Sequence, residues 1–220
     1  MTLRALHREI VACRACPRLV SWRERVAKEK RRAYRDETYW GKPITGFGDP
    51  RASLVIVGLA PGAHGANRTG RIFTGDRSGD FLYAALHRAG CASQAESTSR
   101  DDGLTLRGVY IVCPVRCAPP DNAPTRDELE QCAPFLTREL ALVPARRFLA
   151  LGAIGFQAVL DHFGAAPRPA FSHGLVVTVG PATVVASYHV SQQNTQTGRL
   201  TPAMFDAVLR QALDERAAEQ

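Results

Sequence analysis

Two loops of the sequence combine glycines with side chains that could hold a planar ring and direct a water molecule. The first begins at Gly58 and reads GLAPGAHGANRTGRIFTGD up to Asp76. Glycines let backbone N–H groups approach a ligand closely, Phe73 could stack on a ring, and Asp76 could orient water. Phe73 could equally belong to the core, and Asp76 could cap the helix expected after it. Because the loop lacks the Lys-Ser/Thr end of a P-loop and the dinucleotide spacing, nucleotide hydrolysis and NAD binding are disfavoured.

The second loop reads SYHVSQQNTQTGRL and runs from Ser187 to Leu200. His189 follows the predicted end of a strand, where it could donate a hydrogen bond to a carbonyl oxygen. A lone histidine is often structural, but the run of Ser, Gln, Asn and Thr after it has no explanation in packing. This run favours a binding role, in which small polar groups contact a base or phosphates.

Four cysteines have a spacing that could bind metal. Cys13 and Cys16 form a C-x2-C pair, and Cys117 and Cys132 lie far downstream, with prolines stiffening the segment between them. Four thiolates can complete a tetrahedral zinc site or hold an iron–sulfur cluster, and spacing alone leaves both open, as well as thiols without metal. One tight pair joined to two isolated cysteines fits a cluster somewhat better than zinc. A metal held in this way would tie the N-terminal helices to the body of the domain.

Composition indicates the class of protein and of partner. A chain of 220 residues that is 45% hydrophobic can bury one core, and we expect a single domain spanning residues 1–220. The formal net charge of +7 suggests a polyanionic partner such as nucleic acid. The sequence shows neither a signal peptide nor a long apolar stretch, so we expect a soluble, cytoplasmic protein with no membrane partner. Nothing in the sequence suggests more than a monomer, and a DNA partner would place the protein at the nucleoid.

Short apolar runs alternate with helical patterns along the chain. Strands are predicted at 54–57, 109–112, 147–151, 175–179 and 183–186. Helices are predicted at 2–12, 18–34, 78–90 and 125–142, with one ending at Gly164 and one beginning at Thr201. The second of these helices is rich in Arg and Lys, and it could be a solvated surface helix or lie along a phosphate backbone.

This alternation predicts an α/β fold with three layers, in which helices cover both faces of a central, mostly parallel sheet. Both loops with candidate chemistry follow predicted strands. Since ligands bind at the carboxyl ends of the strands in such sheets, we expect the two loops to form one site.

Taken together, these segments resemble the uracil-DNA glycosylase superfamily, and most closely its iron–sulfur family-5 branch, also called type B. The first loop is similar to that branch's first motif, and SYHVSQQNTQTGRLT is similar to its second. The four cysteines fall where the branch has its cluster ligands, and the segment RCAPPDNAPT from Arg116 to Thr125 also resembles the family. The resemblance implies a mixed-sheet α/β/α fold, a 4Fe-4S cluster, and excision of uracil and other deaminated bases, such as hypoxanthine, from double-stranded DNA.

Three positions depart from patterns seen elsewhere in the superfamily. Leu59 stands where its best-known members have an Asp or Asn that directs water, and the resemblance implies that Asp76 takes that role, as in family 5. Val190 stands where many members have proline. Cys113 lies near the position where the family-4 branch has a base-reading Asn, which implies weaker discrimination between bases.

The residues and the resemblance give an expected role for each side chain. His189 would donate to O2 of the base, Phe73 would stack on it, Asp76 would direct water to C1′, and Asn194 would fill the gap left by the flipped base or contact the complementary strand. The first turn would cradle the base through the backbone of Gly58, Ala60 and Gly62. Contacts to DNA phosphates are expected from Arg68, Arg71, Ser191 and Arg199.

Neither loop contains a lysine, so no Schiff-base nucleophile is available there, and we expect a monofunctional DNA glycosylase without a strand-cleaving step. Two alternatives remain at this stage. One is a non-enzymatic iron–sulfur protein that binds DNA and senses redox state. The other is an enzyme that traps DNA covalently through a second histidine, for which His64 is the nearby candidate.

Overall fold

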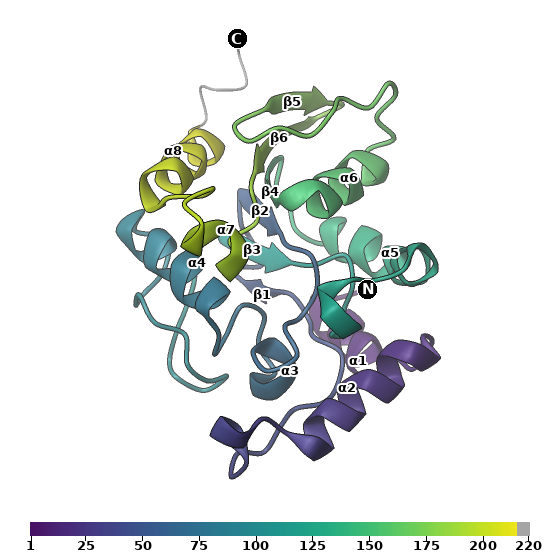
Figure 1. Ribbon diagram of the computed structural model, residues 1–220. Helices are drawn as coiled ribbons and strands as arrows, with labels where there is room; N and C mark the ends of the chain where they lie inside the picture. Colours follow the sequence, from purple (N-terminus) through teal and green to yellow (C-terminus); the bar gives the residue numbers. More distant parts are fainter. Residues whose placement is uncertain (215–220) are drawn as a thin grey trace.

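Six strands form one mixed sheet in the computed structural model, which describes residues 1–214 (Figure 1). Their order across the sheet is β1-β3-β2-β4-β6-β5. The strands are β1 (Phe47–Gly48), β2 (Leu54–Val57), β3 (Val109–Val112), β4 (Arg147–Leu151), β5 (Val176–Val179) and β6 (Ala182–Ser187). The four inner strands are parallel, whereas the edge strands β1 and β5 run antiparallel to their neighbours. The prediction of a mostly parallel sheet is confirmed, and β1 is the strand that the sequence pattern missed.

The inner strands are buried on both faces, as their continuous apolar sequences predict. Ile56 in β2 pairs with Ile111 in β3 and with Leu149 in β4, and all three side chains are inaccessible to solvent. Alternate residues of these strands contribute to two separate hydrophobic cores, one on each face of the sheet.

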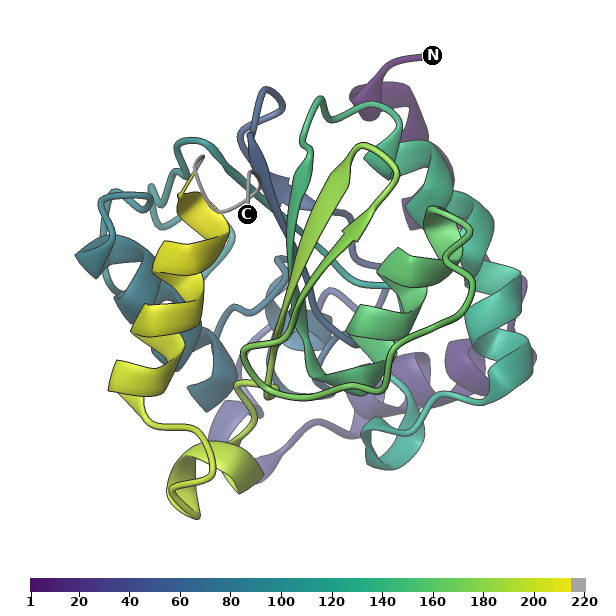
Figure 2. The ribbon, with the colours of Figure 1, turned by 90° about the horizontal axis from the view of Figure 1, so that it is seen from above.

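Helices cover both faces, which gives the three layers seen in Figure 2. One face packs against α4 (Arg77–Arg88) and α8 (Pro202–Leu213), and the other against α5 (Arg126–Leu140) and α6 (Gly152–His162). Next to α5 lies α1 (Leu3–Ala12).

The predicted helix starts are confirmed by their caps. The side chains of Asp76, Thr125 and Thr201 accept hydrogen bonds from backbone N–H groups in the first turns of α4, α5 and α8, and Thr125 forms a complete capping box with Glu128. The helix predicted at 18–34 is shorter than expected. It is α2 (Pro17–Glu29), and it ends because Lys30 takes a φ of 55°, after which a 3-10 turn, η1 (Arg32–Tyr34), follows.

The two loops with candidate functional residues, 58–76 and 187–200, each contain a short helix that the sequence pattern did not predict. These are α3 (Ala66–Thr69) in the first loop and α7 (Gln192–Gln196) in the second. Among residues 1–214, no helix is long and apolar enough to cross a membrane.

Candidate active site

The two loops meet at the carboxyl ends of the central strands, as predicted. The first loop leaves β2 at Gly58, and the second leaves β6 at Tyr188. Close packing of α6 between them requires two glycines. A Cβ on Gly155 would lie 2.6 Å from the carbonyl oxygen of Val57, and one on Gly152 would lie 3.3 Å from Cβ of His189.

Phe73 reaches this point from an unusual backbone conformation. Its φ is +50°, a value that costs a non-glycine residue about 1–3 kcal/mol and that occurs often at functional sites. Its ring lies against the Cα of Gly58, where a Cβ would approach ring atoms to 2.9 Å, and its centroid is 6.1 Å from that of His189. Only 9% of Phe73 is exposed, so the residue is both a core residue and a wall of the site.

Asp76 has two roles, one for each carboxylate oxygen. Oδ1 accepts a hydrogen bond of 3.0 Å from the N–H of Gly79 and caps α4, which is the structural role considered for it. Oδ2 lies over the first loop, where a Cβ on Gly62 would be 2.9 Å from it and one on Gly65 only 1.8 Å. Burial raises the pKa of Asp76, while the N–H groups of Gly79 and Ser78 act in the opposite direction.

His189 lies at the end of β6 as a neutral imidazole. Burial lowers its pKa to about 4, so the ring carries one N–H donor and no charge at neutral pH. The amide Nδ2 of Asn194 donates a hydrogen bond of 2.8 Å to the backbone carbonyl of His189. Asn194 therefore positions the histidine, a role that the sequence did not suggest.

The exposed side of the second loop presents polar and basic groups. Ser191 is the residue before the first turn of α7, it is half-buried, and its side chain makes no capping hydrogen bond, while Arg199 is exposed. The guanidinium of Arg199 lies 4.5 Å from the ring centroid of Tyr188, whose other stacking partner is His173 at 4.9 Å. His173 comes from the segment before β5, and no sequence signal distinguished it.

The predicted phosphate contacts from Arg68 and Arg71 do not fit the structure. Arg68 is 8% exposed, and its guanidinium bonds the backbone oxygens of His64 and Gly75 and the carboxylate of Glu37. Arg71 is 5% exposed, and internal acceptors take its guanidinium donors. Both arginines fold the first loop instead of facing a ligand, because each finds acceptors within the protein.

The four predicted cysteine ligands come together, although they lie in distant parts of the sequence. One small enclosed cavity is lined by all four, namely Cys13, Cys16, Cys117 and Cys132. They are free thiols, and within residues 1–214 no three His, Cys, Asp or Glu side chains are placed to hold one metal ion.

One buried arginine, Arg116, lines the cysteine cavity, and a second, Arg23, contacts one of its cysteines. Arg23 donates to Sγ of Cys117 at 2.8 Å, and Arg116 lines the cavity and pairs with the buried Glu139 at 2.6 Å. Nε of Arg23 and Nε and Nη1 of Arg116 are buried donors with no protein acceptor in the described chain. The unpaired donors of Arg116, which lines the cavity, suit an anionic group there.

Two further residues considered from the sequence, His64 and Cys113, form hydrogen bonds within the protein. Nδ1 of His64 is 3.0 Å from the hydroxyl of Tyr39. Cys113 is 1% exposed and donates to the carbonyl of Val115 at 3.0 Å, and burial raises the pKa of its thiol to about 12.

A wide basic cleft of about 1120 Å³ lies elsewhere, between α1, α2 and the segment around β1. Its lining includes the cations Arg4, Arg8, Lys42 and Arg100, but neither His189 nor Asp76. The cleft is therefore separate from the two loops at the strand ends.

Comparison with known proteins agrees with this arrangement. The family model of the uracil DNA glycosylase superfamily matches residues 45–213. The chain is 54% identical to a type-5 uracil-DNA glycosylase of Thermus thermophilus, over 96% of this chain and 97% of the relative. It is also 54% identical to one of Mycobacterium tuberculosis, over 92% and 78%, and 47% identical to one of Pyrobaculum aerophilum, over 92% and 88%. The chain thus belongs to the uracil-DNA glycosylase superfamily, among the type-5 enzymes.

Proposed function

We propose that this protein hydrolyses the N-glycosidic bond of uracil in DNA and so initiates base excision repair. The observation that carries the proposal is the meeting of His189, Phe73 and Asp76 at one edge of the sheet, in a chain whose close relatives are named uracil-DNA glycosylases. Those names disfavour the non-enzymatic, redox-sensing alternative.

His189 stabilises the leaving base. Bond cleavage leaves negative charge on the pyrimidine. The N–H of the neutral imidazole can donate a hydrogen bond to O2 of the base, and because the ring is buried, water does not compete for this donor. A donor held in place before charge develops contributes about 3–4 kcal/mol in comparable oxyanion sites. Asn194 fixes the backbone that carries this donor, and Phe73 stacks on the base.

Asp76 directs the attacking water. Its Oδ1 is held by the cap of α4, so Oδ2 has a defined position near Gly62 and Gly65. The backbone of Gly58, Ala60 and Gly62 cradles the base on the opposite side of the loop. The carboxylate must be ionised to orient water, and its pKa lies above the ordinary value because of burial.

We also propose that other deaminated bases, such as hypoxanthine, are substrates. At the end of β3, the side chain of Cys113 donates to a backbone carbonyl and offers no amide to pair with the edge of uracil. Without such a pair, discrimination relies on stacking and on the cost of flipping, which is lowest for mispaired bases. Double-stranded DNA is held by the exposed second loop, with Arg199 and Ser191 facing phosphates.

Cys13, Cys16, Cys117 and Cys132 would hold a 4Fe-4S cluster. Four sulfurs around one zinc ion would lie about 3.8 Å apart, given Zn–S bonds of about 2.3 Å. Within residues 1–214 the four cysteines line one cavity but do not form such a single-ion site, and the unpaired donors of Arg116 in the same cavity suit an anionic cluster. When bound, the group would supply a structural cross-link between α2 and the body, and we assign it no chemical step.

The enzyme is monofunctional in this proposal, because neither loop at the site supplies a lysine to form a Schiff base. A covalent histidine adduct is also disfavoured, since Nδ1 of His64 is engaged by Tyr39.

Excision from labelled duplexes that carry one uracil, hypoxanthine or normal base tests the proposal. We expect strand breaks at uracil and hypoxanthine only after alkali, and none at the normal base. Release that falls at least about tenfold in His189→Ala would support the assigned donor. Breaks without alkali, or a complex that survives boiling in detergent, would contradict the monofunctional and non-covalent mechanism respectively.

A further inference from the structure

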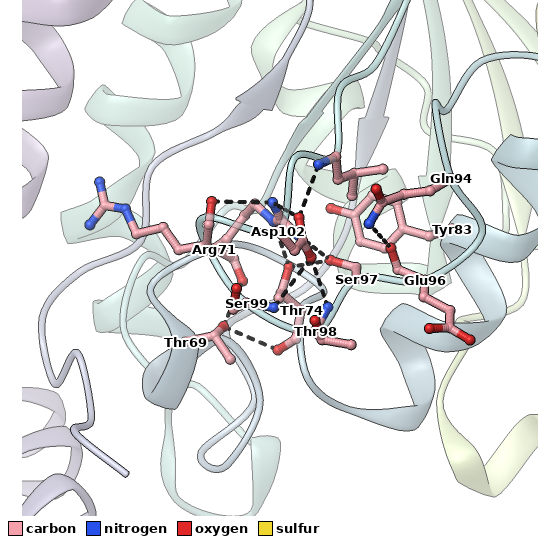
Figure 3. Close-up of polar contacts among 12 residues, drawn as sticks. Thr69, Arg71, Thr74, Tyr83, Gln94, Glu96, Ser97, Thr98, Ser99 and Asp102 are labelled. Atoms are coloured by element: carbon pink, nitrogen blue, oxygen red, sulfur yellow. Dashed lines mark hydrogen bonds and ion pairs between the residues drawn. The ribbon is translucent and has the colours of Figure 1, made fainter.

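The segment between α4 and β3 forms an excursion that packs against the outside of the first loop. It closes at its base through backbone bonds from Ser93 to Thr105 and from Arg107 to Cys91, around an isolated bridge between Ala92 and Leu106. Nothing in the proposed reaction uses this segment, yet it contains a densely bonded polar cluster (Figure 3).

Asp102 is the centre of that cluster. Its carboxylate accepts two hydrogen bonds from Arg71, at 2.8 and 2.6 Å, and three from the backbone N–H groups of Thr98, Ser99 and Leu104. Burial acts to raise the pKa of Asp102, but these bonds outweigh it and hold the pKa well below its usual range. The carboxylate is therefore ionised at every pH at which the protein would work.

Arg71 belongs to the first loop and makes five hydrogen bonds, four to the excursion and one to the loop itself. Besides the two bonds to Asp102, Nε donates to Oγ1 of Thr74 at 3.0 Å, Nη2 to Oγ of Ser97 at 2.7 Å, and Nη1 to the carbonyl of Arg100 at 3.3 Å. A fully matched guanidinium fixes the relative position of every group that it touches.

The groups fixed in this way define the turn between Phe73 and Asp76. Thr74 is completely buried, and its hydroxyl lies 2.7 Å from that of Ser97. The N–H of Gly75 donates to the carbonyl of Ser97 at 2.9 Å. The turn is thus bonded to the excursion, while the side chains of Phe73 and Asp76 at its two ends lie against Gly58 and over Gly62 and Gly65.

We propose that Arg71, Asp102, Ser97 and Thr74 form a clamp that positions Phe73 and Asp76 for base release. The clamp touches neither base nor water, and it holds the strained backbone of Phe73 at its positive φ and the carboxylate of Asp76 over Gly62 and Gly65. The inference rests on the proposed function for the reaction it serves, but the geometry of the clamp stands independently of it.

Two variants test the clamp at different strengths. Asp102→Asn keeps the size of the side chain and removes its charge, whereas Ser97→Ala removes one bridging hydroxyl and leaves the ion pair intact. Arg88→Gln is the matched control, because Arg88 forms a similar two-bond pair with Asp206 between α4 and α8, at 3.1 and 2.7 Å, that does not reach the turn.

The first readout separates chemistry from binding. We expect Asp102→Asn to lower the single-turnover rate of uracil release at saturating DNA at least tenfold, and Ser97→Ala about threefold. The DNA concentration at half saturation should stay within twofold of wild type, because the exposed second loop is untouched. Arg88→Gln should change neither quantity beyond twofold.

The second readout does not depend on activity. Amide hydrogen exchange at Gly75 and Gly79 reports the bonds that hold the turn, and we expect at least tenfold faster exchange in Asp102→Asn but not in Arg88→Gln. The proposal would be overturned if folded variants exchanged these amide hydrogens and released uracil at wild-type rates. If Asp102→Asn does not fold, the same two measurements on Ser97→Ala decide the question. A wild-type protein that releases no uracil would contradict the proposed function, while unchanged exchange would contradict the clamp alone.

Discussion

Replacing Gly65 with alanine would test the catalytic role proposed for the carboxylate of Asp76 directly. The added Cβ would lie 1.8 Å from Oδ2 of Asp76 and 2.6 Å from its Cγ, whereas real Cβ contacts are not shorter than 3.0 Å. The carboxylate must therefore move by at least about 1.2 Å, the difference between 3.0 and 1.8 Å. A displacement of about 1 Å at a reacting group can cost about 100-fold in rate.

The displacement also affects stability, because the other oxygen of Asp76 caps α4. If Oδ1 leaves the N–H of Gly79, the lost cap costs about 1 kcal/mol of the free energy of unfolding. We therefore expect Gly65→Ala to fold, to unfold at a slightly lower denaturant concentration, and to release uracil about 100-fold more slowly at saturating duplex. Gly62→Ala, whose Cβ would be 2.9 Å from the same oxygen, should lose much less.

A double-mutant cycle distinguishes this mechanism from a general disturbance of the loop. In an Asp76→Asn background no catalytic carboxylate remains to be displaced, so Gly65→Ala should slow release by less than about twofold further. Single-turnover release with alkaline detection measures all four proteins. A folded Gly65→Ala variant with a rate within twofold of wild type would refute the assignment of Asp76, as would full additivity in the cycle.

Further predictions concern pH, the second loop and DNA binding. Because His189 has a pKa of about 4 when folded and an ordinary value near 6.5 when unfolded, the unfolded state takes up the proton first, and stability falls as the pH drops from about 6.5 to 4. Urea unfolding should show about 2 kcal/mol lost between pH 7 and 5, and part of that loss should vanish in His189→Gln; an identical loss in both proteins would contradict the buried neutral imidazole. The rate of release should fall at acid pH through the raised pKa of Asp76, and Asp76→Asn should lack this dependence in a pH–rate profile. Asn194→Ala should release uracil about tenfold more slowly without weaker DNA binding, since its amide holds the carbonyl of His189, and weaker binding alone would assign it to DNA contact. Arg199→Ala should weaken DNA binding and reduce its salt dependence by about one counterion in titrations, and an unchanged slope would place the side chain away from phosphates.

The layered fold was predictable because its signals are local. Four-residue apolar runs such as 54–57 and 109–112 are typical of strands that are buried on both faces by helices. The capping residues Asp76, Thr125 and Thr201 mark helix starts to within a residue or two. The strand β1 has only two residues, too short for any periodic pattern, and its pairing with β3 is decided by the surrounding packing.

The sequence predicted that the two loops come together, but it did not show which of their side chains are engaged within the protein. The motif sequence identified Arg71 as basic and close to the site, and exposure to phosphate was the natural expectation. Its acceptor Asp102 lies 31 residues further on, in a segment without a recognisable pattern, so no local signal could show that the guanidinium was engaged. For the same reason the sequence did not indicate that the amide of Asn194 turns back towards the chain, where it bonds the carbonyl of His189.

The first loop is held from two sides, and this explains how a glycine-rich segment can hold Phe73 and Asp76, the groups proposed to act on the base, in fixed positions. On one side the clamp fixes the turn after Phe73. On the other, the buried amide of Asn67 donates to the backbone carbonyl of Arg23 at 3.2 Å, and the side chain of Arg23 reaches Cys117 at 2.8 Å. The cysteine site therefore connects to the catalytic loop through one residue of α2. Glycines allow the backbone of that loop to approach a base closely. The two attachments restrict the backbone conformational freedom that the glycines would otherwise leave.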